Sequence, residues 1–316
     1  MLLALLAAAA LAVHDPAPAT ARPIILIVHG RGQLGRDTSA LRRDLQRSLE
    51  AGLNLPVTDS LFHDGDVRLV WYADVLDPRS DDGCHFHEAN SHSRERWEQR
   101  GGAQGFWNLA RGLVGLAAGA LDSVNGDATR GLLGEMLFAG DLWKRCGAER
   151  RVAEALTVAA LEGRPIVLVS HSFGALVTYG YLEGYRTPVG IRAPDVRRWI
   201  TLGSMLGVSA VRQLMLGDIG TSLPRPPLVQ DWLNLRDPDD ALAARAAEED
   251  SISSALELET VVRGGSLAHE LPTYLRDPRA ARAIAYGWCS AFTAARAAPE
   301  WCALVSDATS QAPPLH

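Results

Sequence analysis

The stretch "PIVLVSHSFGALVTYGYL", residues 165–182, places an apolar run, a short polar turn and a helical pattern next to one another. A continuous apolar run such as Ile166–Val169 is typical of a parallel strand that is buried on both faces of its sheet. The residues from Phe173 to about Leu182 predict a helix. Ser172 is therefore expected at a sharp turn between strand and helix, with its hydroxyl exposed and the helix N-terminus favouring negative charge beside it.

Apolar runs and helical patterns alternate along the rest of the chain. The predicted strands are Ile24–Val28 and residues 67–76, 165–170, 197–204, 230–237 and 256–262. The predicted helices cover residues 38–49, 149–161, 173–182, 208–216 and 276–292. Such alternation predicts an α/β domain with a mostly parallel central sheet and helices on both faces.

One long segment, residues 78–147, does not fit the alternation and is too long for a simple loop. It begins polar and His-rich and then becomes apolar and rich in Gly and Ala. We interpret it as a cap or lid inserted over the sheet edge, lining an apolar pocket. The alternative interpretation is a surface excursion that packs on the core.

A serine needs a neighbouring base before it becomes a good nucleophile. In α/β enzymes with a serine after a strand, the acid and then the histidine follow it along the chain. After Ser172 only His269 and the terminal His316 remain, and His269 lies in a Gly/Ser-rich loop before the last helix. We therefore predict His269 as the base.

The acid is expected after the fifth strand, in "NLRDPDDAL", residues 234–242. Asp240 is favoured because Leu242 returns the chain to the core after a short turn. Asp237 precedes Pro238 and is expected to shape the turn instead. Asp237 stays the main alternative, and Asp239 is a third.

Two backbone N–H groups are expected to bind the oxyanion of a tetrahedral intermediate. One belongs to Phe173, the residue after the serine. The other is assigned to Arg31 in "HGRGQ", residues 29–33, after the first strand. His29 is expected to support that loop, and His171 is expected to pack in the core.

The segments "HGRGQ", "SHSFG", "RWITLGS", "DPDDAL" and "AHELPTYL" together resemble the α/β-hydrolase superfamily, in its lipase/esterase-like branch. The resemblance covers about residues 22–295 and implies the α/β-hydrolase fold. It also implies a Ser172, His269 and Asp240 triad, no cofactor, and a small-molecule ester or lipid as substrate. Ser170 departs from the Gly-x-Ser-x-Gly pattern of the family.

The triad alone leaves several functions open. A carboxylic ester hydrolase is the main prediction, and a thioesterase, acyltransferase or amidase would use the same three residues. A non-catalytic binding protein of the same fold is the alternative from another class, because one fold serves many functions.

Net charge limits the possible partners of the protein, and the N-terminal sequence predicts its location. The 316 residues carry a net charge of −6, which argues against nucleic acid as a partner. Residues 1–21 begin with "MLLALLAAAALAV", which predicts a signal peptide and is too short to span a bilayer. We expect a secreted or periplasmic protein with a C-terminal tail at 296–316. A cytoplasmic chain is the alternative.

Four cysteines predict two disulfides in an exported protein, Cys84–Cys146 and Cys289–Cys302. The alternative is four buried thiols. Cys84 also begins a polar cluster whose spacing matches no metal-site template, so we predict no metal. Its other members are His85, His87, Glu88 and His92.

Overall fold

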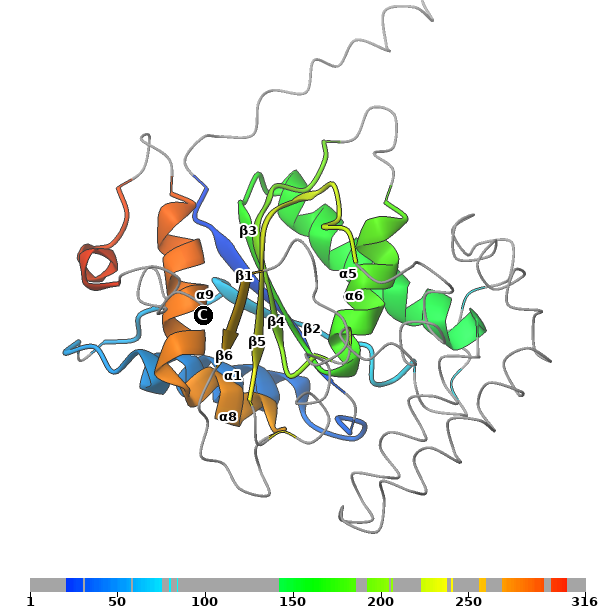
Figure 1. Cartoon of the computed structure of the whole chain (residues 1–316), viewed down its shortest axis with the longest axis horizontal. Helices are drawn as coiled ribbons and strands as arrows, with labels where there is room; N and C mark the ends of the chain where they lie inside the picture. The colour runs from blue at the N-terminus through cyan, green and yellow to red at the C-terminus, as the bar shows by residue number, and fades with distance from the viewer. Residues whose placement is uncertain are drawn as a thin grey trace, which may run out of the picture.

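Six strands form one parallel sheet in the computed structural model, in the order β2-β1-β3-β4-β5-β6 (Figure 1). The strands are β1 (Ile24–Val28), β2 (Val67–Val70), β3 (Ile166–His171), β4 (Val196–Leu202), β5 (Val229–Arg236) and β6 (Leu256–Glu259). The structure describes residues 21–30, 32–57, 59–75, 80, 84, 142–185, 192–204, 206, 223–237, 240, 256–259, 269–292 and 297–305. The predicted α/β architecture around a parallel sheet is confirmed.

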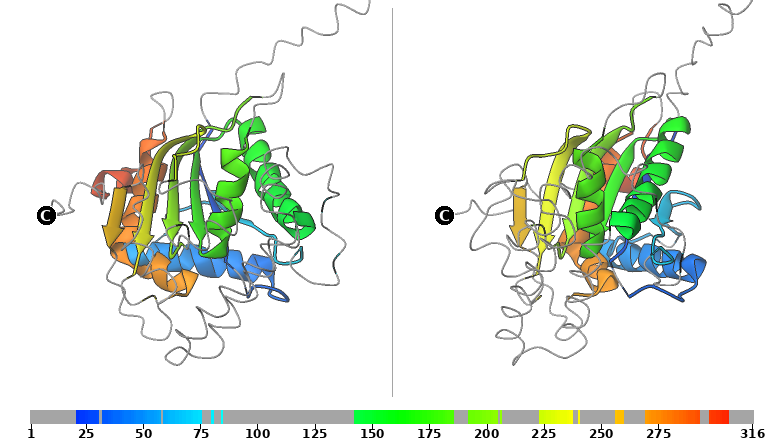
Figure 2. Two further views of the ribbon diagram at one scale, coloured as in Figure 1. Left: turned by 45° about the vertical axis from the view of Figure 1, so that its right-hand side comes forward. Right: turned by 90° about the vertical axis from the view of Figure 1, so that its right-hand side faces the viewer.

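Helices cover both faces of the sheet (Figure 2). One face carries α5 (Leu142–Leu161) and α6 (Phe173–Glu183), and the other carries α1 (Thr38–Leu53), α8 (Leu271–Arg276) and α9 (Pro278–Ser290). Side chains of β1 alternate between the two resulting cores, as the period of a strand requires. Leu26 lies in the core under α5 and α6, and Ile27 lies in the core under α1.

Local chemistry sets the ends of α1 and β2. The Asp37 carboxylate caps α1 by accepting hydrogen bonds from the N–H groups of Ser39 and Ala40, at 2.8 and 3.1 Å. The helix ends at Leu53, one turn beyond the predicted end, and the following Asn54 adopts the left-handed conformation that ends helices. β2 ends at Val70, well before residue 76, and a turn closed by a hydrogen bond from the Val75 N–H to the Tyr72 carbonyl follows two residues later.

α5 begins at Leu142, earlier than the predicted start at 149 and inside the predicted cap at 78–147. Arg145 and Glu149 form an ion pair of 2.9 Å within the helix, and both side chains are almost fully buried. These charged residues look like a surface segment in the sequence, although they belong to the packed domain. The rest of the predicted cap, apart from Ser80 and Cys84, lies outside the described residues, as does the predicted helix at 208–216.

The predicted last helix, residues 276–292, corresponds to α9 (Pro278–Ser290), and a separate short helix that was not predicted, α8 (Leu271–Arg276), precedes it. α8 ends at Arg276, and Asp277 has the extended backbone that the residue before a proline prefers. The Asp277 carboxylate then caps α9 by accepting from the N–H of Arg279 at 2.8 Å.

Both predicted disulfides are present, Cys84–Cys146 and Cys289–Cys302. The second joins α9 to a 3₁₀ helix, η5 (Glu300–Leu304). Trp301 of η5 stacks on Trp288 with ring centroids 5.5 Å apart. The packed domain therefore extends beyond the predicted boundary at 295, and the first part of the predicted C-terminal tail is part of the core.

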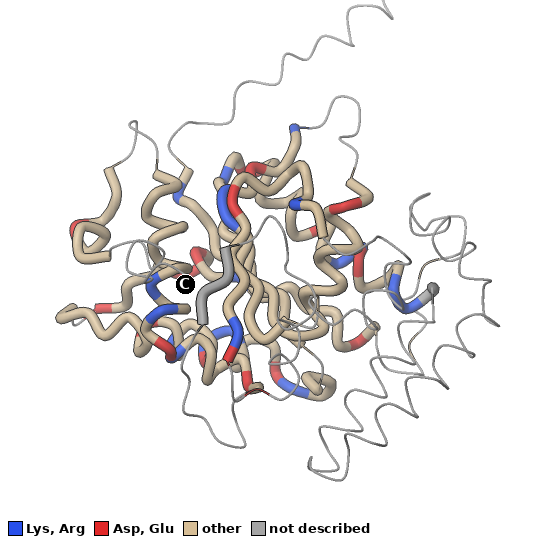
Figure 3. Tube along the Cα trace, in the orientation of Figure 1, with Lys and Arg blue, Asp and Glu red and all other residues tan. Residues whose placement is uncertain are grey.

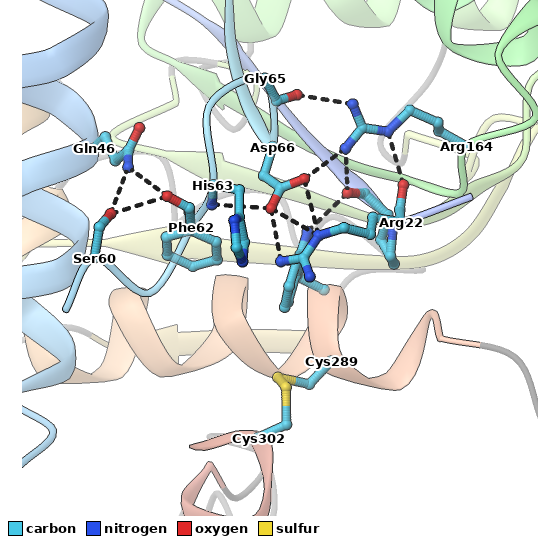
Figure 4. A network of polar contacts seen from close by, with 12 residues as sticks. Arg22, Gln46, Ser60, Phe62, His63, Gly65, Asp66, Arg164, Cys289 and Cys302 are labelled. Carbon is cyan, nitrogen blue, oxygen red and sulfur yellow. Dashed lines mark hydrogen bonds and ion pairs between the residues drawn. A yellow bond between two sulfur atoms is a disulfide. The ribbon is translucent and has the colours of Figure 1, made fainter. Parts of the chain in front are cut away.

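A polar network ties together the amino ends of the first three strands (Figure 4). Asp66, which precedes β2, accepts hydrogen bonds from Arg22 at 2.8 Å and from Arg164 at 2.7 Å. Arg164 also donates to the backbone carbonyls of Arg22, Pro23 and Gly65. The side chain of Asp66 is only 3% exposed, so this network joins strands β1, β2 and β3 away from water.

Charges of both signs are interspersed over the described chain rather than gathered on one side (Figure 3). Among the described residues, no helix combines the length and the apolar composition needed to cross a bilayer.

Candidate active site

The turn between β3 and α6 holds Ser172 in a strained backbone conformation. Its φ and ψ are 52° and −125°. Among the described non-glycine residues, only Ser172 and Asn54 have a positive φ. Such outliers persist where the surrounding structure enforces them, often at functional sites. Gly174 follows because α6 passes directly over β1: a Cβ there would lie 2.4 Å from the carbonyl oxygen of His29.

Ser170 stands where the Gly-x-Ser-x-Gly pattern has its first glycine. The Ser170 hydroxyl is fully buried between the sheet and α6, 2.9 Å from the Thr178 hydroxyl. It also accepts a hydrogen bond from the indole N–H of Trp199 at 3.0 Å. The position needs a small side chain, and here its hydroxyl also satisfies two buried polar partners.

Ser172 is buried, at 2% exposure, so the expectation of an exposed hydroxyl is wrong. The chain after β1 closes on it: a Cβ at Gly30 would lie 3.1 Å from the Ser172 Cβ and 2.9 Å from the His171 ring. Sequence could not reveal this contact, because it depends on how the loop after β1 lies against the turn.

The structure brings Ser172, His269 and Asp240 into one hydrogen-bonded row. His269 Nε2 lies 2.8 Å from Ser172 Oγ, and His269 Nδ1 lies 2.7 Å from Asp240 Oδ2. The Asp240 side chain is fully buried, whereas that of His269 is 29% exposed. The row has the arrangement of a nucleophile, a base and a carboxylate that fixes the base's tautomer.

Asp240 and Asp237 occupy two ends of the same turn after β5. The N–H of Asp240 donates to the carbonyl of Asp237 at 3.1 Å. Asp240, not Asp237, reaches His269, while the N–H of Asp237 donates to the Tyr274 hydroxyl at 3.1 Å. Asp239 lies outside the described residues.

Tyr274 is a site residue that the sequence analysis did not identify. Its hydroxyl donates to Asp240 Oδ2 at 2.8 Å, so it shares that oxygen with His269. The tyrosine lies in the quoted segment "AHELPTYL", but its helical spacing indicates a core residue. Only the packing of α8 beneath the Asp237–Asp240 turn places the hydroxyl at the carboxylate.

His171 packs beside the row, as predicted, and also holds it in place. Its Nε2 donates to the backbone carbonyl of His269 at 2.8 Å, and the two rings lie 5.0 Å apart. Burial, reinforced by neighbouring His269, lowers the pKa of His171 to about 3. His171 is thus neutral near pH 7 and serves as a fixed hydrogen-bond donor.

His29 supports the loop after β1. Its ring stacks on Tyr72 with centroids 4.2 Å apart, and its Nδ1 contacts the carbonyl oxygen of Gly30. Burial lowers the pKa of His29 to about 4, although the bond to Gly30 opposes the shift.

Of the two predicted oxyanion donors, the structure describes Phe173 but not Arg31. Phe173 is buried and begins α6 directly after Ser172, so its N–H belongs to the first turn of that helix. Arg31 lies outside the described residues. Within the described residues no cluster of three His, Cys, Asp or Glu side chains is arranged as a metal site, and Cys84 is bonded to Cys146.

No protein-family model matches the chain, and no curated protein matches it. The assignment of a function therefore rests on the geometry of the site.

Proposed function

We propose that this chain is a serine hydrolase of carboxylic esters, a lipase/esterase-like member of the α/β-hydrolase superfamily. The observation that carries the proposal is the unbroken row from Ser172 Oγ through His269 to Asp240, with contacts of 2.8 and 2.7 Å. Its position supports the same reading, because the row lies at the carboxyl ends of parallel strands, where ligands bind in open α/β sheets.

In the proposed reaction, His269 Nε2 takes the Ser172 proton as Oγ forms a bond to the ester carbonyl carbon. The N–H groups of Phe173 and Arg31 donate to the resulting oxyanion. The imidazolium returns its proton to the leaving alcohol as the ester C–O bond breaks, which leaves an acyl group on Ser172. Water, deprotonated by His269, then attacks the acyl carbon, and Ser172 leaves with a proton to release the acid.

Asp240 stays ionised through this cycle. Its oxygen fixes the tautomer in which His269 Nδ1 carries a proton and Nε2 faces the serine. A buried carboxylate also stabilises the imidazolium that forms in each half of the reaction.

Labelling with a fluorophosphonate probe tests the proposal, together with a chain-length series of p-nitrophenyl esters. We expect the label on the peptide that contains Ser172 and hydrolysis of at least part of the series. Ser172→Ala should abolish both. Ser170→Ala is the matched control, a buried serine two residues away, and should still be labelled.

The outcomes separate the alternatives. A folded protein that neither labels nor hydrolyses is a binding protein, which contradicts the proposal. Faster turnover of matched thioesters or amides than of esters would replace the ester hydrolase by a thioesterase or an amidase. Transfer of the acyl group to an added alcohol in preference to water would indicate an acyltransferase.

We also propose export, to the cell exterior or the periplasm. Two disulfides support it, because such bonds persist in oxidising compartments. Residues 1–20, the main part of the predicted signal peptide, lie outside the described residues. Intact-mass measurement of exported protein should give a chain that starts near Arg22 and has no alkylatable thiol without reductant. Four such thiols would rule out both disulfides, and recovery of the protein only from the cytoplasm would contradict export.

A further inference from the structure

Tyr274 lies directly behind the carboxylate of the proposed triad. Its hydroxyl donates to Asp240 Oδ2 at 2.8 Å, and His269 Nδ1 lies 2.7 Å from the same oxygen. Tyr274 and Asp240 are both buried, at 0% and 1% exposure. One buried oxygen atom is therefore shared between the imidazole and the phenol.

The tyrosine also spans the turn that carries the acid. Its oxygen accepts the N–H of Asp237 at 3.1 Å while its proton goes to Asp240. It lies in α8, which begins two residues after His269. The phenol thus links the segment that supplies the base to both ends of the turn that supplies the acid.

The end of β4 leaves room for this contact. Gly203 has a φ of +53°, and a Cβ there would lie 2.9 Å from Asp240 Oδ2 and 3.0 Å from the Tyr274 hydroxyl. Any larger residue would have to displace one of the two groups. The ends of β4 and β5 and the helix α8 therefore converge on a single hydrogen bond.

We propose that Tyr274 is a positioning residue of this site: its hydroxyl holds the Asp240 carboxylate against His269 and shares its negative charge. The inference rests on the proposed function. The hydroxyl of Tyr274 contacts Asp240 and the backbone of Asp237, so we expect it to act on His269 through Asp240. Hydrogen bonds to ionised groups are stronger than neutral ones, which makes a phenol a firm anchor for a buried carboxylate.

The protonation states of the surrounding groups fit this role. Burial, reinforced by the negative charge of Asp240, raises the pKa of Tyr274 far above its usual range, so the hydroxyl keeps its proton. Among the described titratable groups, Asp240 contacts His269 directly and the His171 ring lies 5.0 Å from it, while Tyr274 and Asp237 lie beyond Asp240. His171 is neutral because burial lowers its pKa to about 3. The acidic limb of the pH profile of kcat/KM therefore reports His269 under the influence of Asp240.

Tyr274→Phe removes the hydroxyl and leaves the ring. With p-nitrophenyl esters we expect kcat to fall about tenfold with KM nearly unchanged, since the lost contact acts on the transition state. Without the phenol, Asp240 holds more of its charge and favours the imidazolium more strongly. The acidic limb should therefore move to higher pH, by about half a pH unit.

Tyr179→Phe is the matched control. Tyr179 is also fully buried, and its hydroxyl donates to the carbonyl of Pro224 at 3.1 Å, in the core under α6. This variant should lose stability much as Tyr274→Phe does but keep the wild-type kcat and pH profile. Equal profiles for the two variants would overturn the inference.

Replacement of Tyr274 by p-aminophenylalanine keeps the shape and restores a weaker donor. We expect most of kcat to return and the acidic limb to lie between those of wild type and Tyr274→Phe, which also tests the inference if the Phe variant folds poorly. A kcat as low as that of the Phe variant would overturn it. Failure here leaves Ser172 labelling intact, whereas failure of the proposed function abolishes the label, so the two are distinguishable.

Discussion

The two ends of the parallel sheet both hold a buried carboxylate, but they neutralise it differently. At the amino ends of β1, β2 and β3, Asp66 accepts from two permanently charged groups, Arg22 and Arg164 (Figure 4). At the carboxyl ends, Asp240 is met by the phenol of Tyr274 and by His269, which becomes positive only when it takes a proton. The first carboxylate has two permanently charged partners, whereas in the proposed reaction the second would gain a charged partner when His269 accepts the Ser172 proton.

Positive φ occurs at both ends of the sheet: Gly65 and Gly163 precede β2 and β3, and Ser172 and Gly203 follow β3 and β4. Of these four residues only Ser172 carries a side chain, so the backbone strain lies at the carboxyl end of β3. A structure can keep such conformations only where surrounding contacts enforce them. If the proposed function holds, the amino end of the sheet serves stability and the carboxyl end serves catalysis, and mutations at each end test this division.

The largest effect is expected at the carboxyl end. Ser172→Ala and His269→Ala should each lower kcat for ester hydrolysis by about 10⁶-fold, and the double variant should be no slower, because residues that act as a unit do not add. Steady-state kinetics with p-nitrophenyl esters measure kcat, and urea unfolding checks that each variant is folded. A double variant far slower than either single variant would contradict the pairing.

Asp240→Asn should lower kcat by about 10⁴-fold while the fold is kept, because the amide no longer fixes the His269 tautomer. Asp237→Asn is the matched control from the same turn. It should retain most activity and lose about 1 kcal/mol of stability. The reverse pattern would show that Asp237 is the acid.

The amino end should respond in the opposite sense. Asp66→Asn leaves Arg22 and Arg164 without their buried countercharge and should cost about 3–5 kcal/mol of stability, with kcat unchanged in the folded protein. Asp64→Asn is the control, since Asp64 is 93% exposed in its pair with Arg42 and should matter by less than about 0.5 kcal/mol. Urea unfolding decides the matter, and equal midpoints for the two variants would refute a structural role for the network.

The smallest effect concerns acid stability. Burial lowers the pKa of His29 to about 4, from 6.5 in the unfolded chain. Between pH 6.5 and pH 4 the unfolded state therefore binds a proton at His29 that the folded state does not bind. The contribution of neutral His29 to the free energy of unfolding is complete above pH 6.5 and is lost as the pH falls towards 4. His171, lowered to about 3, adds a loss of the same sign.

His29→Gln should therefore flatten the fall of unfolding free energy between pH 6.5 and pH 4.5, by about 1 kcal/mol per pH unit. Urea unfolding at several pH values measures the slope. A slope equal to that of the wild-type protein would mean that His29 is not held neutral.

Most of the sheet could be predicted because both of its faces are covered, so its strands are continuous apolar runs. The turn at Ser172 was predictable for a related reason: strand, turn and helix follow one another within residues 165–182. The structure also brings His269 and Asp240 to Ser172, in keeping with their order along the chain. Their catalytic roles stay predictions.

The features that escaped prediction depend on contacts between distant segments. Arg145 and Glu149 look like surface residues until their mutual pairing inside the core is known. Tyr274 looks like any apolar helix residue until the acid's turn lies over it. The burial of Ser172 depends on Gly30, far away in the sequence.

The strand order has a consequence for how the chain folds. β1 lies between β2 and β3, so the pairing of β1 with β3 requires the chain to close a very long loop that contains α1, β2 and α5. The Cys84–Cys146 bond joins residues 62 positions apart within that loop and shortens the path that must be closed. Halving a loop lowers its closure entropy by only about 0.6 kcal/mol, so oxidation before the strands meet should speed their encounter by no more than about threefold. Chains that form the Cys84–Cys146 bond before β1 meets β3 should thus fold only slightly faster than reduced chains.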